Sequence, residues 1–497
     1  MSKVTPFDIP LLINAICRHL SCEDLKYCML VSKAWSTWSA SVLWRDLNCE
    51  RKTPDIPTLR RHQEHIRIVQ NITMWSIRDS GERLPFPHVQ RLEFKDDSSE
   101  DGIHRTEIRV LPLLEGITSL QHLKITLSLD RDNIYRQFVR TLESLPQLES
   151  LSLRCQWFID GKVIQDILRV CHRLECLSLV FLGKDRHITE EDRQEFIDTR
   201  VEIQKMPEMR LRELSFDAYS DLVVENILHP LLERCPRIEK LDPGSYTTSS
   251  NRHLSKLFKE NKFPKLRHLV AGGRDIAEAL SHVECGLESL VFRGNPSEPV
   301  IQTLSQYHSC MTKLHVTGVS LWEFSDLMAG LPNLQTFKSY MRPDYEGSSR
   351  DIPFEKHWEC VNLMNLRLYV EGWGNGATIE HEQKGSRRML ALDYVFSEIA
   401  KMTSLQVLFL DYRIADLYFM ENGYLTRLAD LKQLRDFDLG SNLGGVIGKE
   451  EALWMIKNWP KLLRVYGPPT LVEFEMTLRR KRPQIQVLCR SAMRFPE

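Results

Sequence analysis

A glycine-rich run near the C-terminal end of the chain has the residue types of a phosphate-binding loop. Residues 444–450 read Gly-Gly-Val-Ile-Gly-Lys-Glu. A phosphate loop places four residues between its two glycines and a Ser or Thr after the lysine, because that hydroxyl binds magnesium. Here three residues separate Gly444 from Gly448, and Glu450 follows Lys449. The run is therefore interpreted as an ordinary loop.

Motifs for other reactions fail on spacing as well. Gly372-Trp-Gly-Asn-Gly376 does not have the G-x-G-x-x-G spacing, and neither G-x-S-x-G nor H-E-x-x-H occurs. The 16 histidines show no metal-ligand spacing, and the 12 cysteines include no C-x-x-C pair. The sequence therefore predicts a protein that is not an enzyme, that holds no cofactor and no metal, and whose cysteines are reduced thiols.

A set of cationic and aromatic residues in the second half of the chain has binding chemistry instead. Lysine and arginine donate charge-assisted hydrogen bonds to carboxylate or phosphate, and aromatic rings supply apolar contact area. The candidate substrate-binding residues are Lys338, Tyr340, Arg367, Tyr369 and Phe409. If they stand on adjacent strands, about 4.8 Å apart, they form one patch. The alternative interpretation is that these long side chains merely cover a solvated sheet face.

A repeat would supply the strands that position this patch. From residue 89 onward an apolar residue is followed three and five positions later by further apolar residues, which is the L-x-x-L-x-L pattern of a leucine-rich repeat. The period is roughly 28 residues, which leaves room for a helix between strands. Copies begin at Val89, Leu120, Leu148, Leu174, Leu211, Ile238, Leu266, Leu287, Met311, Leu334, Leu363, Leu405, Leu434 and Leu462.

Helical periodicity fills several of the intervals between these copies. Apolar residues recur at helical spacing in residues 134–145, 163–171, 222–231 and 453–459. The predicted fold class is therefore α/β, a leucine-rich-repeat solenoid with parallel strands on its concave face and helices on its convex face. Unrelated strands in an ordinary α/β domain would not keep one pattern in register over so long a stretch.

The first 47 residues read as three short helices with more apolar side chain than they can bury among themselves. Ile9, Leu12, Ile13, Ile16 and Leu20 recur at helical spacing. Ser21 and Asp24 have the spacing of a capping box, which predicts a second helix from about Cys22, and a third begins near Ser32. The apolar excess predicts a docking surface.

This segment resembles an F-box, the module by which a substrate receptor binds the Skp-type adaptor of a cullin-RING ubiquitin ligase. The matching phrases, in order, are Ile9-Pro10, Leu20-Ser21-x-x-Asp24-Leu25, Val31-Ser32-Lys33-x-Trp35 and Leu43-Trp44-x-x-Leu47. Ile9 stands where the family usually has Leu. The adaptor-binding residues that the resemblance implies are Ile9, Pro10, Ile13, Ile16, Leu20, Leu25, Val31, Ser32, Lys33, Trp35, Leu43 and Trp44. Phrases such as Cys171-His-Arg-Leu174 and Cys235-Pro-Arg-Ile238 resemble the cysteine-bearing repeats of F-box receptors.

The resemblance implies an F-box protein with leucine-rich repeats that serves as the substrate-recognition subunit of an SCF-type ubiquitin ligase and directs a target to proteasomal degradation. Its expected partners are a Skp-type adaptor, through it a cullin scaffold, and a protein substrate. The predicted domains are an F-box over 1–47, a connector with a degenerate first repeat over 48–88, and the solenoid over 89–497. The alternative is a leucine-rich-repeat binding scaffold that assembles no ligase, with its N-terminal helices acting only as a cap.

Charge and hydropathy exclude other classes of partner. The chain has 66 Lys plus Arg against 67 Asp plus Glu, so we expect no general nucleic-acid binding. It has no apolar run long enough for a membrane span and no signal-peptide pattern, so we expect a cytoplasmic or nuclear protein without a membrane partner. Arg479-Arg-Lys-Arg482 could be a nuclear address or a phosphate contact, although a solvated helix end is favoured. Two insertions, residues 342–358 and 371–388, are expected to border the binding surface.

Overall fold

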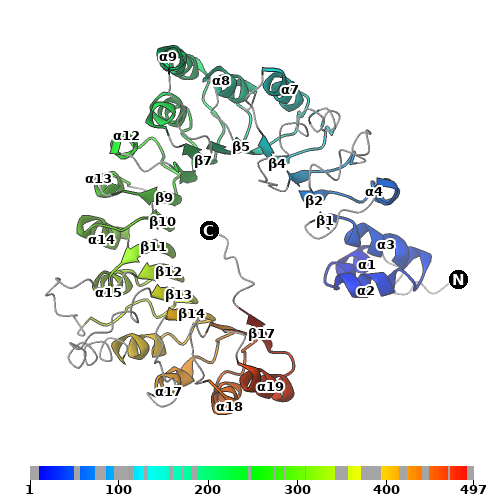
Figure 1. Cartoon of the computed structure of the whole chain (residues 1–497), viewed down its shortest axis with the longest axis vertical. Coiled ribbons are helices and arrows are strands. Elements are labelled where there is room, and N and C mark those ends of the chain that lie inside the picture. The colour runs from blue at the N-terminus through cyan, green and yellow to red at the C-terminus, as the bar shows by residue number, and fades with distance from the viewer. Residues whose placement is uncertain are drawn as a thin grey trace. The chain divides into compact units, whose positions relative to one another are not determined.

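The structure is a computed structural model, and it describes most of the chain. The described residues are 10–49, 56–72, 86–94, 111, 114, 117–127, 132–155, 161–170, 172–181, 189–218, 220–244, 248–273, 276–283, 286–307, 309–341, 356–370, 393–412, 423–438, 447–467 and 471–489. The chain divides into two compact units, Met1–Ser245 and Tyr246–Glu497. Figure 1 shows their elements, and each unit is described by itself.

The first unit begins with three helices, as the sequence predicts. They are α1 (Pro10–Cys17), α2 (Cys22–Cys28) and α3 (Lys33–Leu43). The predicted capping box is present, because the Ser21 hydroxyl accepts a hydrogen bond from the Asp24 backbone N–H while the Asp24 carboxylate accepts one from the Ser21 backbone. Ser32 caps α3 by accepting a hydrogen bond from the Trp35 backbone N–H.

Parallel strands form the sheet of the first unit, each hydrogen-bonded to the next along the chain. They are β1 (Asp46–Asn48), β2 (Ile68–Ile72), β3 (Arg91–Phe94), β4 (His122–Leu127), β5 (Ser150–Cys155), β6 (Cys176–Phe181), β7 (Glu213–Ala218) and β8 (Lys240–Asp242). Helices lie on one side of these strands (Figure 1). They are α4 (Ile56–His62), α7 (Asp132–Glu143), α8 (Gly161–Val170), α9 (Glu190–Lys205), α10 (Asp221–Val223) and α11 (His229–Glu233).

A π-helical turn, η2 (Val224–Leu228), interrupts the helix predicted over residues 222–231. Pro230 follows it in α11. Because proline has no N–H, it cannot donate to the carbonyl four residues back, and the helix adjusts around the missing bond. The predicted helix is thus present but irregular.

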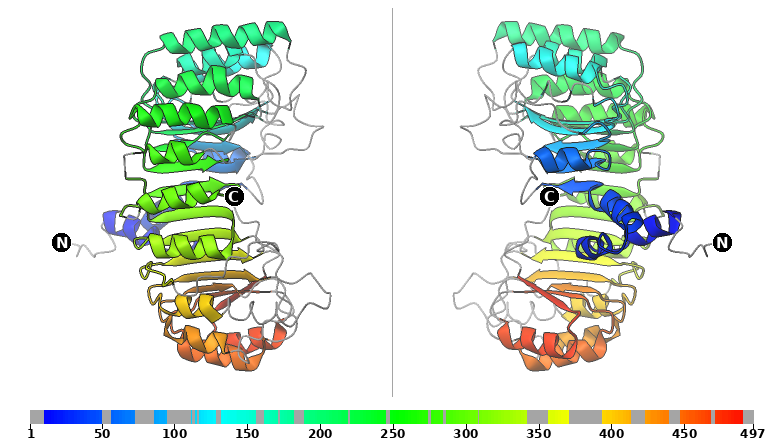
Figure 2. Two further views of the ribbon diagram at one scale, coloured as in Figure 1. Left: turned by 90° about the vertical axis from the view of Figure 1, so that its left-hand side faces the viewer. Right: turned by 90° about the vertical axis from the view of Figure 1, so that its right-hand side faces the viewer.

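The second unit repeats the same arrangement of parallel strands. They are β9 (His268–Gly272), β10 (Ser289–Arg293), β11 (Lys313–Val319), β12 (Thr336–Met341), β13 (Asn365–Val370), β14 (Val407–Tyr412), β15 (Asp436–Asp438), β16 (Arg464–Gly467) and β17 (Gln486–Cys489). The helices and 3-10 turns before and between them are α12 (Thr248–Lys259), α13 (Ile276–Ser281), α14 (Glu298–Leu304), η3 (Ser305–Tyr307), α15 (Leu321–Gly330), α17 (Tyr424–Arg427), η4 (Leu428–Asp430), α18 (Lys449–Asn458) and α19 (Val472–Lys481). Residues 393–400 are also helical. Figure 2 shows that neighbouring helices within a unit stack side by side.

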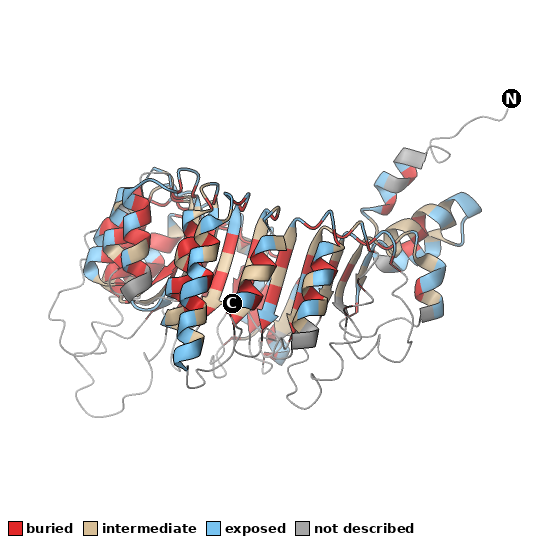
Figure 3. Ribbon diagram, turned by 90° about the horizontal axis from the view of Figure 1, so that it is seen from above, coloured by how far each residue is buried: buried red, intermediate tan, exposed pale blue. Residues whose placement is uncertain are grey.

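The core of each unit lies between its strands and its helices, where the repeat leucines point. Leu151 and Leu153 on β5 and Leu366 and Leu368 on β13 are fully buried, and the residues between them are not. Figure 3 shows buried and less buried residues alternating along the strands. This is the period-2 alternation of a strand with one face covered by helices. The opposite face of the strands is called the open face below.

The predicted fold class is confirmed, since every predicted copy of the repeat coincides with a strand and the helices lie between strands. The sequence did not predict strands at β1 and β17, and it predicted β2 only as part of a degenerate repeat. Among the described residues, the terminal strand β1 pairs with β2 and β17 pairs with β16. The predicted domain boundaries at residues 47 and 88 remain predictions, because the two compact units instead meet after Ser245.

Candidate functional site

The candidate substrate-binding residues come together on the open face of the second unit. Strand register pairs Lys338 on β12 with Arg367 on β13, and Arg367 with Phe409 on β14. In the neighbouring row Tyr340 pairs with Tyr369. The repeat therefore places all five on three adjacent strands, as the sequence predicts.

Ring contacts hold this cluster together. The rings of Tyr340 and Tyr369 stack with centroids 4.4 Å apart and an interplanar angle of 13°. The Lys338 ammonium lies 5.7 Å from the centre of the Tyr340 ring, and the Arg367 guanidinium lies 4.5 Å from the centre of the Phe409 ring. Both cations are thus within cation–π distance of an aromatic face. Such contacts restrict where the two charged groups can point.

Burial limits what the rings can offer to a partner. Tyr340 is 42% exposed, whereas Tyr369 is 7% and Phe409 is 3% exposed. Arg367 covers Phe409 on one side, and Tyr466 of β16 contacts it edge-on with ring centroids 5.1 Å apart. The expectation that all three rings give contact area to a ligand is therefore too broad, because Tyr340 is the ring that stays open.

His315 belongs to the same row, although it was not chosen as a candidate from the sequence. It stands on β11 in register with Lys338. Its Nε2 atom is buried and has no hydrogen-bond partner within the described part of the chain. Burial lowers the pKa of His315 to about 4, and the nearby charges of Lys338 and Arg293 act in the same direction. The imidazole is therefore neutral at physiological pH. The repeat pattern could have identified His315 as a site residue, because His315 follows Leu314 just as Lys338 follows Phe337.

Acidic side chains mark the other end of this face. Asp438 on β15 pairs in register with Phe409 and is fully buried. Its neighbour Asp436 receives two hydrogen bonds from Arg464, each 2.7 Å long. The positively charged part of the row therefore ends at β13.

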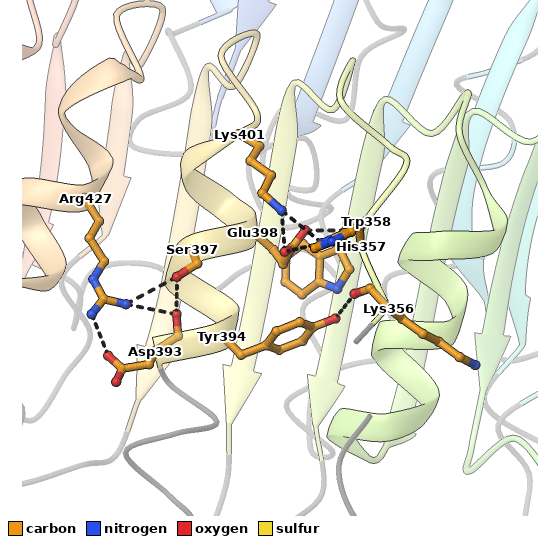
Figure 4. Close-up of polar contacts among 9 residues, drawn as sticks. All are labelled: Lys356, His357, Trp358, Asp393, Tyr394, Ser397, Glu398, Lys401 and Arg427. Atoms are coloured by element: carbon orange, nitrogen blue, oxygen red, sulfur yellow. Dashed lines mark hydrogen bonds and ion pairs between the residues drawn. The ribbon is translucent and has the colours of Figure 1, made fainter. Parts of the chain in front are cut away.

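Of the two predicted insertions, residues 342–355 of the first and all of 371–388 lie outside the described residues. One buried carboxylate holds the described end of the first insertion, residues 356–358. Glu398 accepts hydrogen bonds from the Trp358 backbone N–H at 3.0 Å and from the Lys401 ammonium at 2.5 Å (Figure 4). His357 Nδ1 lies 3.3 Å from the same carboxylate. Burial raises the pKa of Glu398, but the hydrogen bonds from Lys401, Trp358 and His357 outweigh it and hold that pKa below its ordinary value. The carboxylate is thus ionised and fixed.

Further polar contacts reinforce this anchor (Figure 4). The Tyr394 hydroxyl donates to the Lys356 carbonyl at 2.5 Å, and the Lys356 ammonium pairs with Asp326 of α15. Arg427 of α17 pairs with Asp393 at 2.9 Å. These contacts tie residues 356–358 and the helix at 393–400 to their neighbours. That the insertions 342–358 and 371–388 border the binding surface stays a prediction, because residues 342–355 and 371–388 lie outside the described residues.

The N-terminal helices expose a second candidate surface. Their core consists of Ile13, Cys17 and Leu25, with Leu20, Trp35, Trp38, Val42 and Leu43 packed partly buried against it. On α1, Leu12 is 45% and Ile16 is 39% exposed. Tyr27, Leu30 and Val31 are exposed around the end of α2. Three short helices thus leave a group of apolar side chains uncovered.

The residues that the F-box resemblance implies differ in how far they are exposed. Ile13 and Leu25 lie in the core, so they shape the segment from inside. Ile16, Val31, Ser32 and Lys33 are exposed, whereas Leu20, Trp35, Leu43 and Trp44 are half-buried. Ile9 and the side chain of Pro10 lie outside the described residues. Leu12, Tyr27 and Leu30 were not among the candidates, although the helical period already placed Leu12 on the apolar stripe.

The join between the helices and the first strands is direct. The Trp44 ring stacks on the His62 ring of α4, with centroids 4.3 Å apart and an interplanar angle of 6°. The Arg45 carbonyl accepts hydrogen bonds from the backbone N–H groups of Arg67 and Ile68. One face of the Trp44 ring is therefore occupied within the chain.

Within the described ranges, no group of three or more His, Cys, Asp and Glu side chains could hold a metal ion. In the same part of the chain, no helix is both long and apolar enough to cross a membrane.

Comparison with known proteins finds only distant similarity to solved structures. No family model matches the sequence, and no curated protein matches it. Among solved structures, the Rad7 and Elc1 complex in yeast matches with 13% identity and a TM-score of 0.37, over 97% of this chain and 92% of that chain. The TLR13–ssRNA13 complex matches with 15% identity and a TM-score of 0.28, over 90% of this chain. The present chain spans 65% of that TLR13 chain. Similarity at this level supports no conclusion about function, so the function has to be argued from the residues of this chain.

Proposed function

We propose that this chain is the substrate-recognition subunit of an SCF-type cullin-RING ubiquitin ligase. In this proposal the N-terminal segment is an F-box that binds a Skp-type adaptor, and the adaptor connects it to a cullin. The leucine-rich repeats bind a target protein. The chain itself carries out no chemistry, since the other subunits transfer ubiquitin and mark the target for proteasomal degradation.

The observation that carries the proposal is the uncovered apolar surface of the N-terminal helices. Leu12 and Ile16 stand one helical turn apart on α1 and face solvent, while Ile13 between them fills the core. Covering a large apolar side chain that is half exposed yields about 1 kcal/mol. A partner that covers these two, together with Tyr27, Leu30 and Val31, thus gains several kcal/mol. The order of the sequence phrases in this segment supports an adaptor as that partner.

The direct join to the repeats supports a receptor rather than a loosely tethered adaptor module. The Trp44–His62 stack and the hydrogen bonds to the Arg45 carbonyl link α3 to α4 and to β2 within the same compact unit. A receptor works by proximity, because it raises the effective concentration of target lysines near the ubiquitin carrier. A fixed join makes that proximity geometrically defined.

The test is co-purification of the full chain with a Skp-type adaptor. The informative variant is Leu12→Glu with Ile16→Glu, because both side chains are exposed and their replacement leaves the small core intact. The matched control is Ile197→Glu with Val201→Glu on α9, a pair with the same spacing and similar exposure, 46% and 44%.

We expect the wild type and the α9 control to retain the adaptor and the α1 variant to lose it, with circular dichroism unchanged in all three. If the wild type fails to bind the adaptor, the proposal is wrong, and the chain is a repeat scaffold whose N-terminal helices are a cap. If the α1 variant binds as well as the wild type, the adaptor does not use this surface.

A further inference from the structure

We infer that His315, Lys338 and Arg367 form a row of N–H donors that binds the anionic groups of an extended segment of the target protein. This inference rests on the proposed function for its partner, a protein segment. The ligand chemistry is an oxygen anion, either carboxylate or phosphate. The site includes a strand, β11, that the cationic and aromatic patch predicted from the sequence does not reach.

Strand register defines the row. His315 on β11 pairs with Lys338 on β12, and Lys338 pairs with Arg367 on β13. Neighbouring strands lie about 4.8 Å apart, so the row spans about 10 Å. An extended segment presents side chains i and i+2 on one side, about 7 Å apart. Two acidic groups at that spacing fit within the length of the row, and one phosphate fits between two neighbouring donors.

Electrostatics favour an anion at this place. Like charges at directly paired strand positions repel each other, and Lys338 and Arg367 are such a pair. No carboxylate within the described ranges lies at ion-pair distance from Arg367. Its guanidinium instead lies over the Phe409 ring, and its Nε donates to Asn365 Oδ1 at 3.3 Å. These contacts hold the guanidinium in place before a ligand arrives. A bound anion turns the repulsion between the two cations into attraction to a shared partner.

His315 gives the row a neutral donor at its third position. A neutral imidazole has one N–H donor and one acceptor nitrogen. The buried Nε2 of His315 has no hydrogen-bond partner within the part of the chain that the structure describes, and an oxygen anion beside Lys338 would supply one. The ring also lies 6.4 Å from the ring of Tyr340, the aromatic group left open for the apolar part of the segment.

The experiment measures binding of fluorescein-labelled peptides to the full chain. The probes are a peptide with the core Asp-Gly-Asp between glycines and serines, the same peptide with phosphoserine in place of both aspartates, and the same peptide with serine there. The test variant is Lys338→Gln with Arg367→Gln, and the third donor is removed separately by His315→Phe. The matched control is Lys124→Gln with Arg154→Gln, which removes two cations from the open face of β4 and β5 in the first unit.

We expect the wild type and the control to bind at least one anionic peptide and not the serine peptide, with affinity that falls as salt rises. The double variant should lose affinity at least ten-fold and His315→Phe several-fold. Tighter binding of the phosphoserine peptide would identify phosphate as the source of the anion, and tighter binding of the aspartate peptide would identify carboxylate. The inference is overturned if the wild type binds no anionic peptide, or if the double variant and the control lose affinity equally. Adaptor co-purification of the same variants is read separately, so failure of the ligase proposal is distinguishable from failure of this one.

Discussion

The carboxylate of Glu398 accepts a hydrogen bond from the backbone N–H of Trp358, 40 residues earlier in the chain. The same carboxylate also binds the Lys401 ammonium. One buried acid thus fixes the end of the segment between β12 and β13 to the helix before β14.

Replacement of Glu398 by Gln should therefore destabilise the protein. The neutral amide keeps the shape of the side chain but loses the charge-assisted hydrogen bonds, so we expect the free energy of unfolding to fall by about 1–2 kcal/mol. Urea unfolding followed by fluorescence measures this. The control is Glu288→Gln, which removes an exposed ion pair with Arg267 and should cost less than about 1 kcal/mol. Equal losses in the two variants would show that Glu398 is not an anchor.

The contribution of Glu398 should depend on pH in a defined direction. Its pKa in the folded protein lies below the ordinary value, since the hydrogen bonds from Lys401, Trp358 and His357 outweigh burial. A group with a depressed folded pKa stabilises the protein above its unfolded pKa, and that stabilisation is lost as the pH falls through the folded value. The stability difference between wild type and Glu398→Gln should therefore be full at pH 7 and shrink below about pH 4.3. A difference that grows on acidification would contradict this assignment.

Ser21→Ala should loosen α2 in the N-terminal segment. The substitution leaves the Asp24 backbone N–H without its capping acceptor, and loss of such a cap costs about 1 kcal/mol. We expect amide exchange across Cys22–Cys28 to speed up about five-fold, as measured by hydrogen–deuterium exchange. Thr37→Ala on α3 removes a hydroxyl that bonds only within its own helix and should leave exchange nearly unchanged. Unchanged exchange in Ser21→Ala would mean that the cap does not limit opening of α2.

Cys235 and Cys360 should resist alkylation in the folded protein. Burial raises the pKa of each thiol to about 12, and the thiolate is the reactive form. We expect N-ethylmaleimide at pH 7.5 to leave both unmodified without denaturant and to modify both in 6 M guanidinium, as read by peptide mass spectrometry. Rapid labelling of either thiol in the native protein would contradict its buried placement.

The sequence predicts the fold well because the repeat is a local pattern. Leu123 and Ile125 on β4, like their counterparts in later copies, alternate with residues that are half-buried or exposed. In the sequence, the matching alternation of apolar residues identifies a half-covered strand. The terminal strands β1 and β17 could not be predicted in this way. Leu47 is the lone repeat-type residue within β1, and β17 follows Ile485 as Gln-Val-Leu-Cys without a full leucine phrase.

The candidate site is predicted less completely, since burial depends on residues far along the chain. Register follows from the period, so the pairing of Lys338 with Arg367 could be foreseen. The covering of Phe409 depends on Tyr466, two strands farther along, which no local pattern reveals. The same limit applies to α1, because periodicity gives an apolar stripe but does not say that Ile13 turns inward while Leu12 and Ile16 remain exposed.

The most direct test of the central claim is hydrogen–deuterium exchange of the full chain with and without a Skp-type adaptor. If the N-terminal helices are an F-box, the adaptor should slow exchange in peptides covering Pro10–Leu43 and leave the peptides of β11, β12 and β13 unchanged. Adaptor binding that protects only the repeats, or that leaves the first 43 residues unprotected, would contradict the account.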